Sequence, residues 1–147
     1  MREYRYIIVP IVTLILAQLI KFTIESVDGH KLKWGRLLSG SGGMPSSHTS
    51  FTFSLATAIG IGEGFTSPLY AISLVFSMVV AYDAMGLRME SGKQAATINH
   101  IMDEMFGKNA KVGFRKLKEE LGHNPAEVVA GILFGSFAAW SLMTILG

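Results

Sequence analysis

The chain has 147 residues, of which 50% are hydrophobic and 16% are charged, and its formal net charge is +2. Soluble proteins typically contain about 25% charged residues, so this composition argues against a soluble domain and indicates a membrane protein. The length fits a single domain, 1–147, and the absence of cysteine excludes thiol catalysis and thiolate metal ligation.

Four apolar stretches approach the length of about 20 residues that a helix needs to cross a bilayer. They cover 4–23, 46–64, 67–85 and 125–146. The second stretch is diluted by serine and threonine, which are common where membrane helices pack closely. A soluble bundle of very apolar helices is the alternative, but the last stretch carries no charge after Glu127. We therefore expect an all-α polytopic membrane bundle of about four transmembrane helices.

The positive charges are distributed unevenly between the two sides that this topology defines. All lysines and arginines except Arg2 and Arg5 lie in 21–48 or 84–124, and these two loops share one face of the membrane. The positive-inside rule makes that face cytoplasmic and puts both termini outside. We expect an integral protein of the inner or plasma membrane.

The second of these loops is predicted to contain helical structure. Apolar residues recur at helical spacing over 93–106, which indicates an amphipathic helix on the cytoplasmic side. We expect this helix to lie on the membrane surface or to cap the bundle. A second short helix is predicted near 112–121, where the mixed charges are typical of a solvated face.

The topology also brings polar residues from four helix ends to one membrane face. Each has an ordinary explanation as an interfacial anchor, a helix cap or a structural histidine. Their coincidence at one depth favours a functional site, because ionisable groups at membrane depth are commonly functional. These residues are Lys21, Ser46, Ser47, His48, Asp83, Arg88, His123 and Glu127.

The residue types at this face favour phosphate binding. Ser46 and Ser47 lie at a helix start, where free backbone N–H groups bind anions, behind a glycine-rich loop. Arg88 offers a bidentate fork to phosphate oxygens and Lys21 a point charge. Asp83 is expected to organise the site by pairing with Lys21 or Arg88. Direct metal binding is not expected, because no neighbouring carboxylate completes a site for a hard cation.

Two histidines extend phosphate binding to phosphoryl transfer. One neutral imidazole can attack phosphorus while a protonated one gives its proton to the leaving oxygen. Glu127 stands four residues after His123 and can hold its ring if a helix starts there. We interpret His30 and His100 as ordinary surface or interfacial residues.

Two motifs resemble the type-2 phosphatidic acid phosphatase superfamily, which includes the vanadium-dependent haloperoxidases. They are GGMPSSH at 42–48 and GHNPAEVVAG at 122–131, and they are most similar to the divergent membrane-embedded branch of that superfamily. Ser47 stands where the first family motif has glycine, and Glu127 stands where the last has aspartate. The residues that match are Pro45, Ser46, His48, His123, Pro125, Val128 and Gly131.

The resemblance implies metal-independent hydrolysis of a phosphomonoester or diphosphate through a phosphohistidine, without a cofactor. It makes His123 the nucleophile, Glu127 its orienting acid and His48 the general acid. Ser46 and Arg88 become phosphate ligands. The usual first family motif is absent, and Lys21 is the preferred substitute, followed by Lys33 and Arg36.

We therefore expect a membrane phosphatase that acts on a lipid phosphate or an isoprenoid diphosphate. The second hypothesis is a noncatalytic phosphate- or lipid-binding membrane protein, or a small transporter subunit. Membrane lipid is an expected partner and nucleic acid is not. The sequence leaves the oligomeric state open, a homodimer included.

Overall fold

A computed structural model describes residues 4–27, 43–106, 116–117, 119 and 122–146. All regular secondary structure in these residues is helical, which confirms the predicted fold class. The helices that match the four predicted stretches begin and end within a few residues of the expected bounds. The structure consists of α1 (Arg5–Val27), α3 (Ser47–Glu63), α4 (Pro68–Met85), α5 (Leu87–Phe106) and α6 (Pro125–Leu146).

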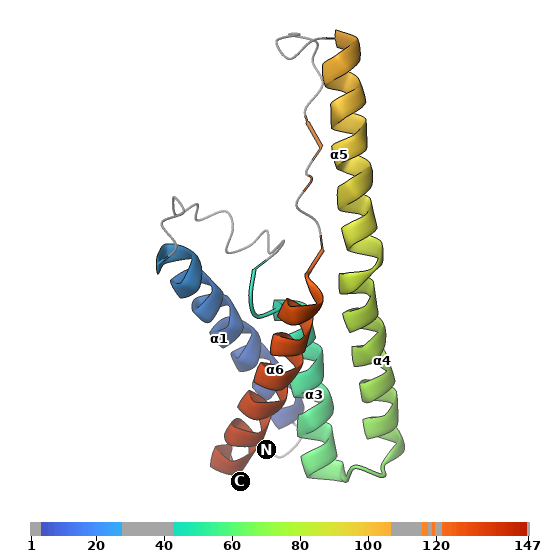
Figure 1. The fold of residues 1–147 in the computed structure, drawn as a ribbon. Coiled ribbons are helices and arrows are strands. Elements are labelled where there is room, and N and C mark those ends of the chain that lie inside the picture. The colour runs from blue at the N-terminus through green and yellow to red at the C-terminus, as the bar shows by residue number, and fades with distance from the viewer. Residues whose placement is uncertain (1–3, 28–42, 107–115, 118, 120–121, 147) are drawn as a thin grey trace.

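Helix α3 is the central element of the bundle. It packs against α6, α1 and α4, whereas α1 and α4 make their main bundle contacts through α3. Figure 1 shows α3 and α6 side by side between α1 and α4. Because α3 faces other helices on several sides, it needs little lipid-facing apolar surface, which explains its many hydroxyl side chains.

Three stretches of the described helices are long and apolar enough to cross a membrane, namely Arg5–Ile24, Pro68–Met105 and Pro125–Leu146. Helix α3, with 17 residues, is the shortest of the helices that match predicted spans. Large apolar side chains cover the outward faces of α1, α4 and α6, as expected for surfaces in contact with lipid and unusual for a soluble monomer. They include Ile7, Ile11, Ile15, Ile72, Val75, Val79, Leu133 and Phe137.

Small residues let α3 and α6 approach closely. A Cβ atom at Gly131 of α6 would lie 2.8 Å from the backbone oxygen of Ser46, and one at Gly135 would lie 2.8 Å from the Cα atom of Ser50. Two glycines four residues apart form the spacing at which membrane helices bring their backbones together. The facing stripe of α3 consists of Ser46, Ser50, Ser54 and Ala58, all buried.

Several buried hydroxyl groups of the bundle bond to carbonyl groups within one turn of their own chain segment. Ser50 Oγ donates to the Ser46 carbonyl at 2.8 Å, and Ser54 Oγ donates to the Phe51 carbonyl at 2.8 Å. These local bonds satisfy groups that would otherwise be costly in an apolar surrounding. The polar stripe of α3 is therefore compatible with a position at membrane depth.

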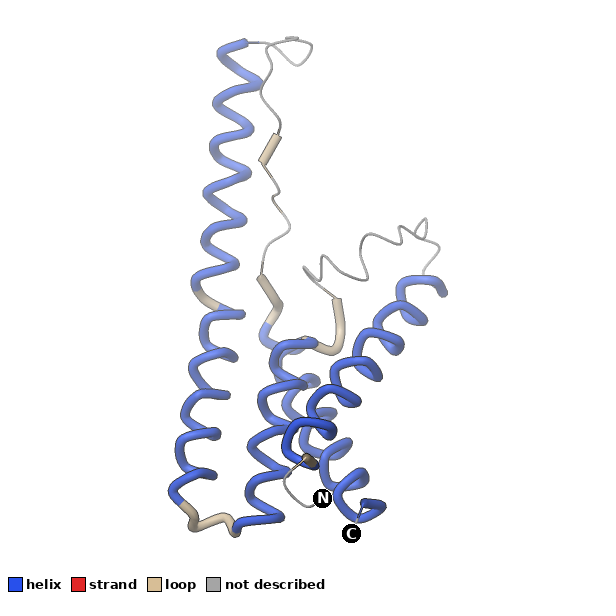
Figure 2. The backbone as a smooth tube through the Cα atoms, turned by 180° about the vertical axis from the view of Figure 1, so that it is seen from behind, coloured by secondary structure: helices blue, strands red, loops and turns tan. Residues whose placement is uncertain are grey.

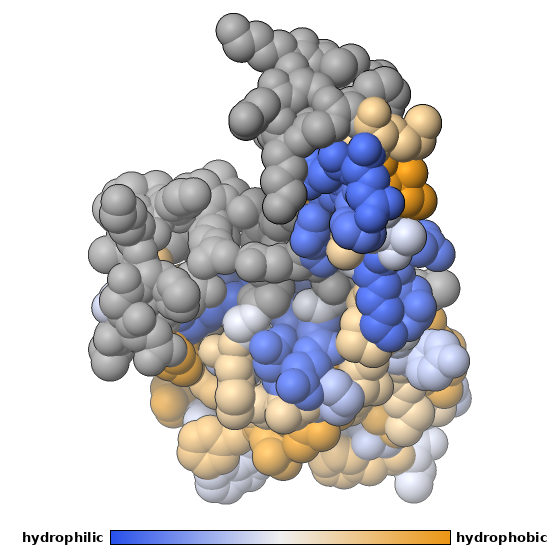
Figure 3. Space-filling model, turned by 45° about the horizontal axis from the view of Figure 1, so that its top comes forward, coloured by the Kyte–Doolittle hydropathy of each residue, from blue (hydrophilic) through white to orange (hydrophobic). Residues whose placement is uncertain are grey.

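The two ends of the bundle differ in composition. Figures 1 and 2 show both chain termini at one end, together with the connection between α3 and α4. At the other end lie the end of α1, the starts of α3 and α6, and the end of α4, as the predicted topology requires. Figure 3 shows hydrophilic residues gathered at this second end and hydrophobic surface below them. Which end faces the cytoplasm stays a prediction.

Helix α5 differs from the sequence expectation in length and direction. It begins at Leu87 rather than near Lys93, and it continues the line of α4 away from the bundle, so it does not cap the bundle (Figure 1). The Lys93 ammonium contacts the Glu90 carboxylate at 2.7 Å and supports the added first turn. Of the short helix expected near 112–121, only Lys116, Leu117 and Glu119 are described, and these three are not helical.

The close contact of α3 with α6 predicts that Gly135→Ala destabilises the protein. A Cβ atom at this position would meet the α3 backbone, which cannot yield as a flexible side chain can. We expect a loss of about 1–3 kcal/mol, the usual cost of overpacking, measured by thermal unfolding in detergent. The control is Leu133→Ala on the exposed face of α6. Equal stability of the two variants would contradict the proposed contact.

The topology predicts opposite labelling of two single cysteines. Thr66→Cys, in the connection between α3 and α4, should react with an impermeant maleimide on intact cells. Gln94→Cys, exposed on α5, should react only after the cells are opened, because the positive-inside rule predicts that the lysine-rich face is cytoplasmic. The chain has no other cysteine to interfere. The reverse pattern would invert the orientation, and labelling of both from one side would contradict the topology.

Candidate active site

The sequence-predicted pair of His123 and Glu127 is formed at the start of α6. His123 Nδ1 lies 2.8 Å from Glu127 Oε2, and His123 is only 4% exposed. A carboxylate accepts this bond, so in the neutral form of the ring the proton lies on Nδ1 and the lone pair on Nε2. The contact thus orients the neutral form of the imidazole as a nucleophile requires.

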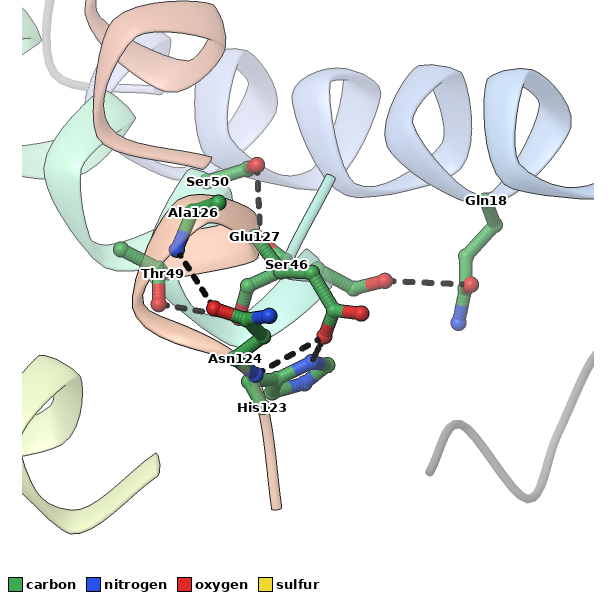
Figure 4. Close-up of polar contacts among 9 residues, drawn as sticks. Gln18, Ser46, Thr49, Ser50, His123, Asn124, Ala126 and Glu127 are labelled. Carbon is green, nitrogen blue, oxygen red and sulfur yellow. Dashed lines mark hydrogen bonds and ion pairs between the residues drawn. The ribbon is translucent and has the colours of Figure 1, made fainter. Parts of the chain in front are cut away.

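A capping arrangement, rather than a continuous helix, brings the two side chains together. His123 precedes α6, which begins at Pro125. The Ala126 N–H donates to Asn124 Oδ1 at 3.2 Å, and the Asn124 N–H donates to Glu127 Oε2 at 3.3 Å (Figure 4). This is the reciprocal pattern of a capping box, with proline at the first helical position. Asn124 was not among the residues predicted from the sequence, although Asn-Pro-Ala-Glu before an apolar run is a signal for a helix start.

Two backbone hydrogen bonds fix the start of α6 against its neighbours. The His123 N–H donates to the Ala84 carbonyl of α4 at 3.0 Å, and the Ser46 N–H donates to the Glu127 carbonyl at 3.0 Å. Gly122, immediately before His123, has a φ of 92°, a conformation that favours glycine. The ends of three helices are thus joined by main-chain bonds around the buried histidine.

The adjacent serines of the first motif contact different elements. Ser46 is fully buried, and its hydroxyl lies 2.9 Å from Thr49 Oγ1 instead of capping the backbone of α3. Ser47 Oγ donates to Gln18 Oε1 of α1 at 3.1 Å. Ser46 thus lies beside the histidine pair, whereas Ser47 faces α1. Gln18 was not among the residues predicted from the sequence, although a polar residue within an apolar span is a signal for a functional contact.

The remaining predicted residues surround this end of the bundle. Lys21 is buried and lies one turn beyond Gln18 on the same face of α1. His48 is exposed in the first turn of α3, and Asp83 is half-buried next to Ala84. Arg88 belongs to the first turn of α5, but its side chain lies outside the described part, so its role as a phosphate ligand stays a prediction.

His100 lies on α5 and not at this site. His100 Nε2 lies 3.3 Å from Glu104 Oε1 in an exposed pair on α5, as expected for a surface residue. His30 lies outside the described residues. Within the described part of the chain, no group of three or more His, Asp or Glu side chains is arranged to hold a metal ion.

Comparison with known proteins agrees with this architecture. The chain is 39% identical to the uncharacterized membrane protein YuiD of Bacillus subtilis, over 83% of each chain. No solved structure matches the chain significantly. The model of a family described as the divergent PAP2 family matches residues 3–138, which include both motifs, the whole of α1, α3, α4 and α5, and the first part of α6. The chain therefore belongs to the divergent PAP2 family.

Proposed function

We propose that the protein is an integral membrane phosphatase that hydrolyses a lipid phosphate or an isoprenoid diphosphate through a phosphohistidine. The observation that carries this proposal is the bond between His123 Nδ1 and Glu127, because it leaves Nε2 with a lone pair. Family membership supports a phosphatase in general terms. A polar site at the end of an apolar bundle suits a substrate with a charged headgroup and an apolar tail.

The reaction has two steps at phosphorus. His123 Nε2 attacks the phosphorus atom, the bond from phosphorus to the ester or anhydride oxygen breaks, and His48 gives its proton to the leaving oxygen. A water molecule then attacks the phosphohistidine and loses a proton to His48, which releases inorganic phosphate and restores both histidines. Glu127 stabilises the positive charge that develops on the His123 ring.

The start of α3 supplies the phosphate-binding groups in this proposal. Ser46 does not cap its own helix, so the first-turn N–H groups of α3 are not occupied by that side chain. Lys21 and Arg88 supply positive charge, Ser47 holds the α1 side of the helix start through Gln18, and Asp83 organises the basic residues. We propose that the site faces the cytoplasm, in the inner or plasma membrane.

The second candidate is a noncatalytic phosphate- or lipid-binding membrane protein. One observation favours it, because the Glu127 carboxylate also accepts a bond from the Asn124 N–H and so has a structural reason to be present. In this alternative the contact between His123 and Glu127 only stabilises the start of α6. The two candidates require different properties of the Glu127 side chain. A helix cap needs only a hydrogen-bond acceptor, whereas catalysis needs a negative charge.

Glu127→Gln should separate these roles. Glutamine serves the capping box as glutamate does, so α6 and the thermal stability should be retained. The charge that stabilises the protonated ring is lost, so phosphate release from a lipid phosphate in detergent should fall by about 10²- to 10⁴-fold. Glu127→Ala is the comparison variant, since it should lose both stability and activity. Full activity of Glu127→Gln would contradict the catalytic role.

Substitutions of His123 and of His48 should impair different steps of the proposed reaction. His123→Ala should abolish turnover and the acid-labile phosphoryl-enzyme, whereas His48→Ala should slow turnover by about 10²-fold or more. A substrate with a good leaving group, such as p-nitrophenyl phosphate, needs less protonation and should partly rescue only His48→Ala. His100→Ala, in the exposed pair on α5, is the control and should keep full activity. A phosphoryl-enzyme that persists in His123→Ala would refute the assignment.

A further inference from the structure

One asparagine of α5 binds residues that precede His123 in the chain. Asn99 is only 6% exposed. Its Nδ2 donates to the Leu117 carbonyl at 2.8 Å and to Glu119 Oε1 at 2.7 Å, and its Oδ1 accepts from the Leu117 N–H at 2.9 Å. A contact of 2.6 Å between Lys116 Nζ and Asp103 Oδ2 adds a second attachment. The chain just before the site is therefore bound to α5 in one register.

The chemistry of Asn99 is specific for a backbone peptide group. Its side-chain amide pairs with both the N–H and the carbonyl of Leu117, and the remaining N–H is taken by a carboxylate. Asparagine is unfavourable inside a helix, so its burial there indicates a requirement other than helix stability. Gly92 and Ala95 lie on the same buried face of α5 and leave room for a close neighbour.

The same chain is fixed a second time where it reaches the site. The His123 N–H donates to the Ala84 carbonyl at the end of α4. His123 follows Leu117 by only six residues. Release at Asn99 would therefore loosen the main chain that leads directly into His123.

We propose that Asn99 is a positioning residue for His123, although it lies on α5 outside the bundle. The Asn99 amide fixes the register of Leu117, and this register determines how the chain enters His123 and its bond to Ala84. The catalytic consequence rests on the proposed function, because only an attacking histidine needs exact placement. Asn99 acts on the nucleophile through the chain and does not touch the substrate.

Two substitutions test this role in the full-length protein in detergent. Asn99→Asp keeps the shape but loses both donors and puts a negative charge beside Glu119, and Asn99→Leu removes all three bonds. Each should lower kcat by about tenfold or more, the scale on which a misplaced reacting group acts, with KM changed less than about twofold. Gln94→Ala, exposed on the same helix, is the control and should leave kcat unchanged.

A second readout does not depend on activity. The modification of buried His123 by diethyl pyrocarbonate, followed by peptide mass spectrometry, should become about tenfold faster in both Asn99 variants. Cysteines replacing Asp103 and Lys116, joined by a short thiol-reactive cross-linker, should restore kcat and the protection of His123 in Asn99→Leu. The chain has no native cysteine, so the cross-link is unambiguous.

The outcomes separate this inference from the proposed function. Unchanged His123 modification in both Asn99 variants would overturn the positioning role, and so would faster modification that the cross-link does not reverse. If the unsubstituted protein releases no phosphate from any lipid phosphate, the proposed function fails. The change in His123 modification and its reversal by the cross-link would still establish the attachment in that case.

Discussion

The site depends on the absence of side chains at two positions of α6. Gly131 and Gly135 let the α6 backbone lie against the backbone of α3 at Ser46 and Ser50. Only at this separation can the Ser46 N–H reach the Glu127 carbonyl at 3.0 Å. A methyl group at either glycine would push the two helices apart. It would also move His123 and Glu127 away from the start of α3. Van der Waals contact between small residues, which drives helix association in membranes, therefore determines the geometry of the polar site.

One oxygen of the Glu127 carboxylate contacts both the start of α6 and the His123 ring. Its Oε2 accepts from the Asn124 N–H and faces His123 Nδ1, so the oxygen that begins α6 also sets the tautomer of the histidine. In the function we propose, the helix start is itself part of the catalytic group, and α6 cannot fray without loss of the nucleophile.

The start of α3 makes different contacts with α6 and with α1. On the α6 side, the main-chain bond from the Ser46 N–H to the Glu127 carbonyl holds the start of α6 close to the backbone of α3. On the α1 side, Gln18 holds Ser47, and buried Lys21 brings positive charge one turn further along. In the function we propose, a charged headgroup meets the protein donors at this end of the bundle, because the outer faces are apolar. Beyond it, α5 continues α4 away from the bundle and gives the chain before His123 a second support at Asn99.

The sequence by itself determined the features that depend on local pattern. Apolar stretches of membrane length predicted the bundle helices closely, and the four-residue spacing of His123 and Glu127 predicted their contact. The Asn-Pro-Ala-Glu cap and the two glycines of α6 were equally readable, because a cap and a close helix approach each require particular residues at fixed spacing. The tertiary structure alone decided that Ser46 and Ser47 face different helices and that α5 continues α4. It also decided that Asn99 binds Leu117, because such contacts join residues far apart in the chain, and their partners are selected by how whole helices pack.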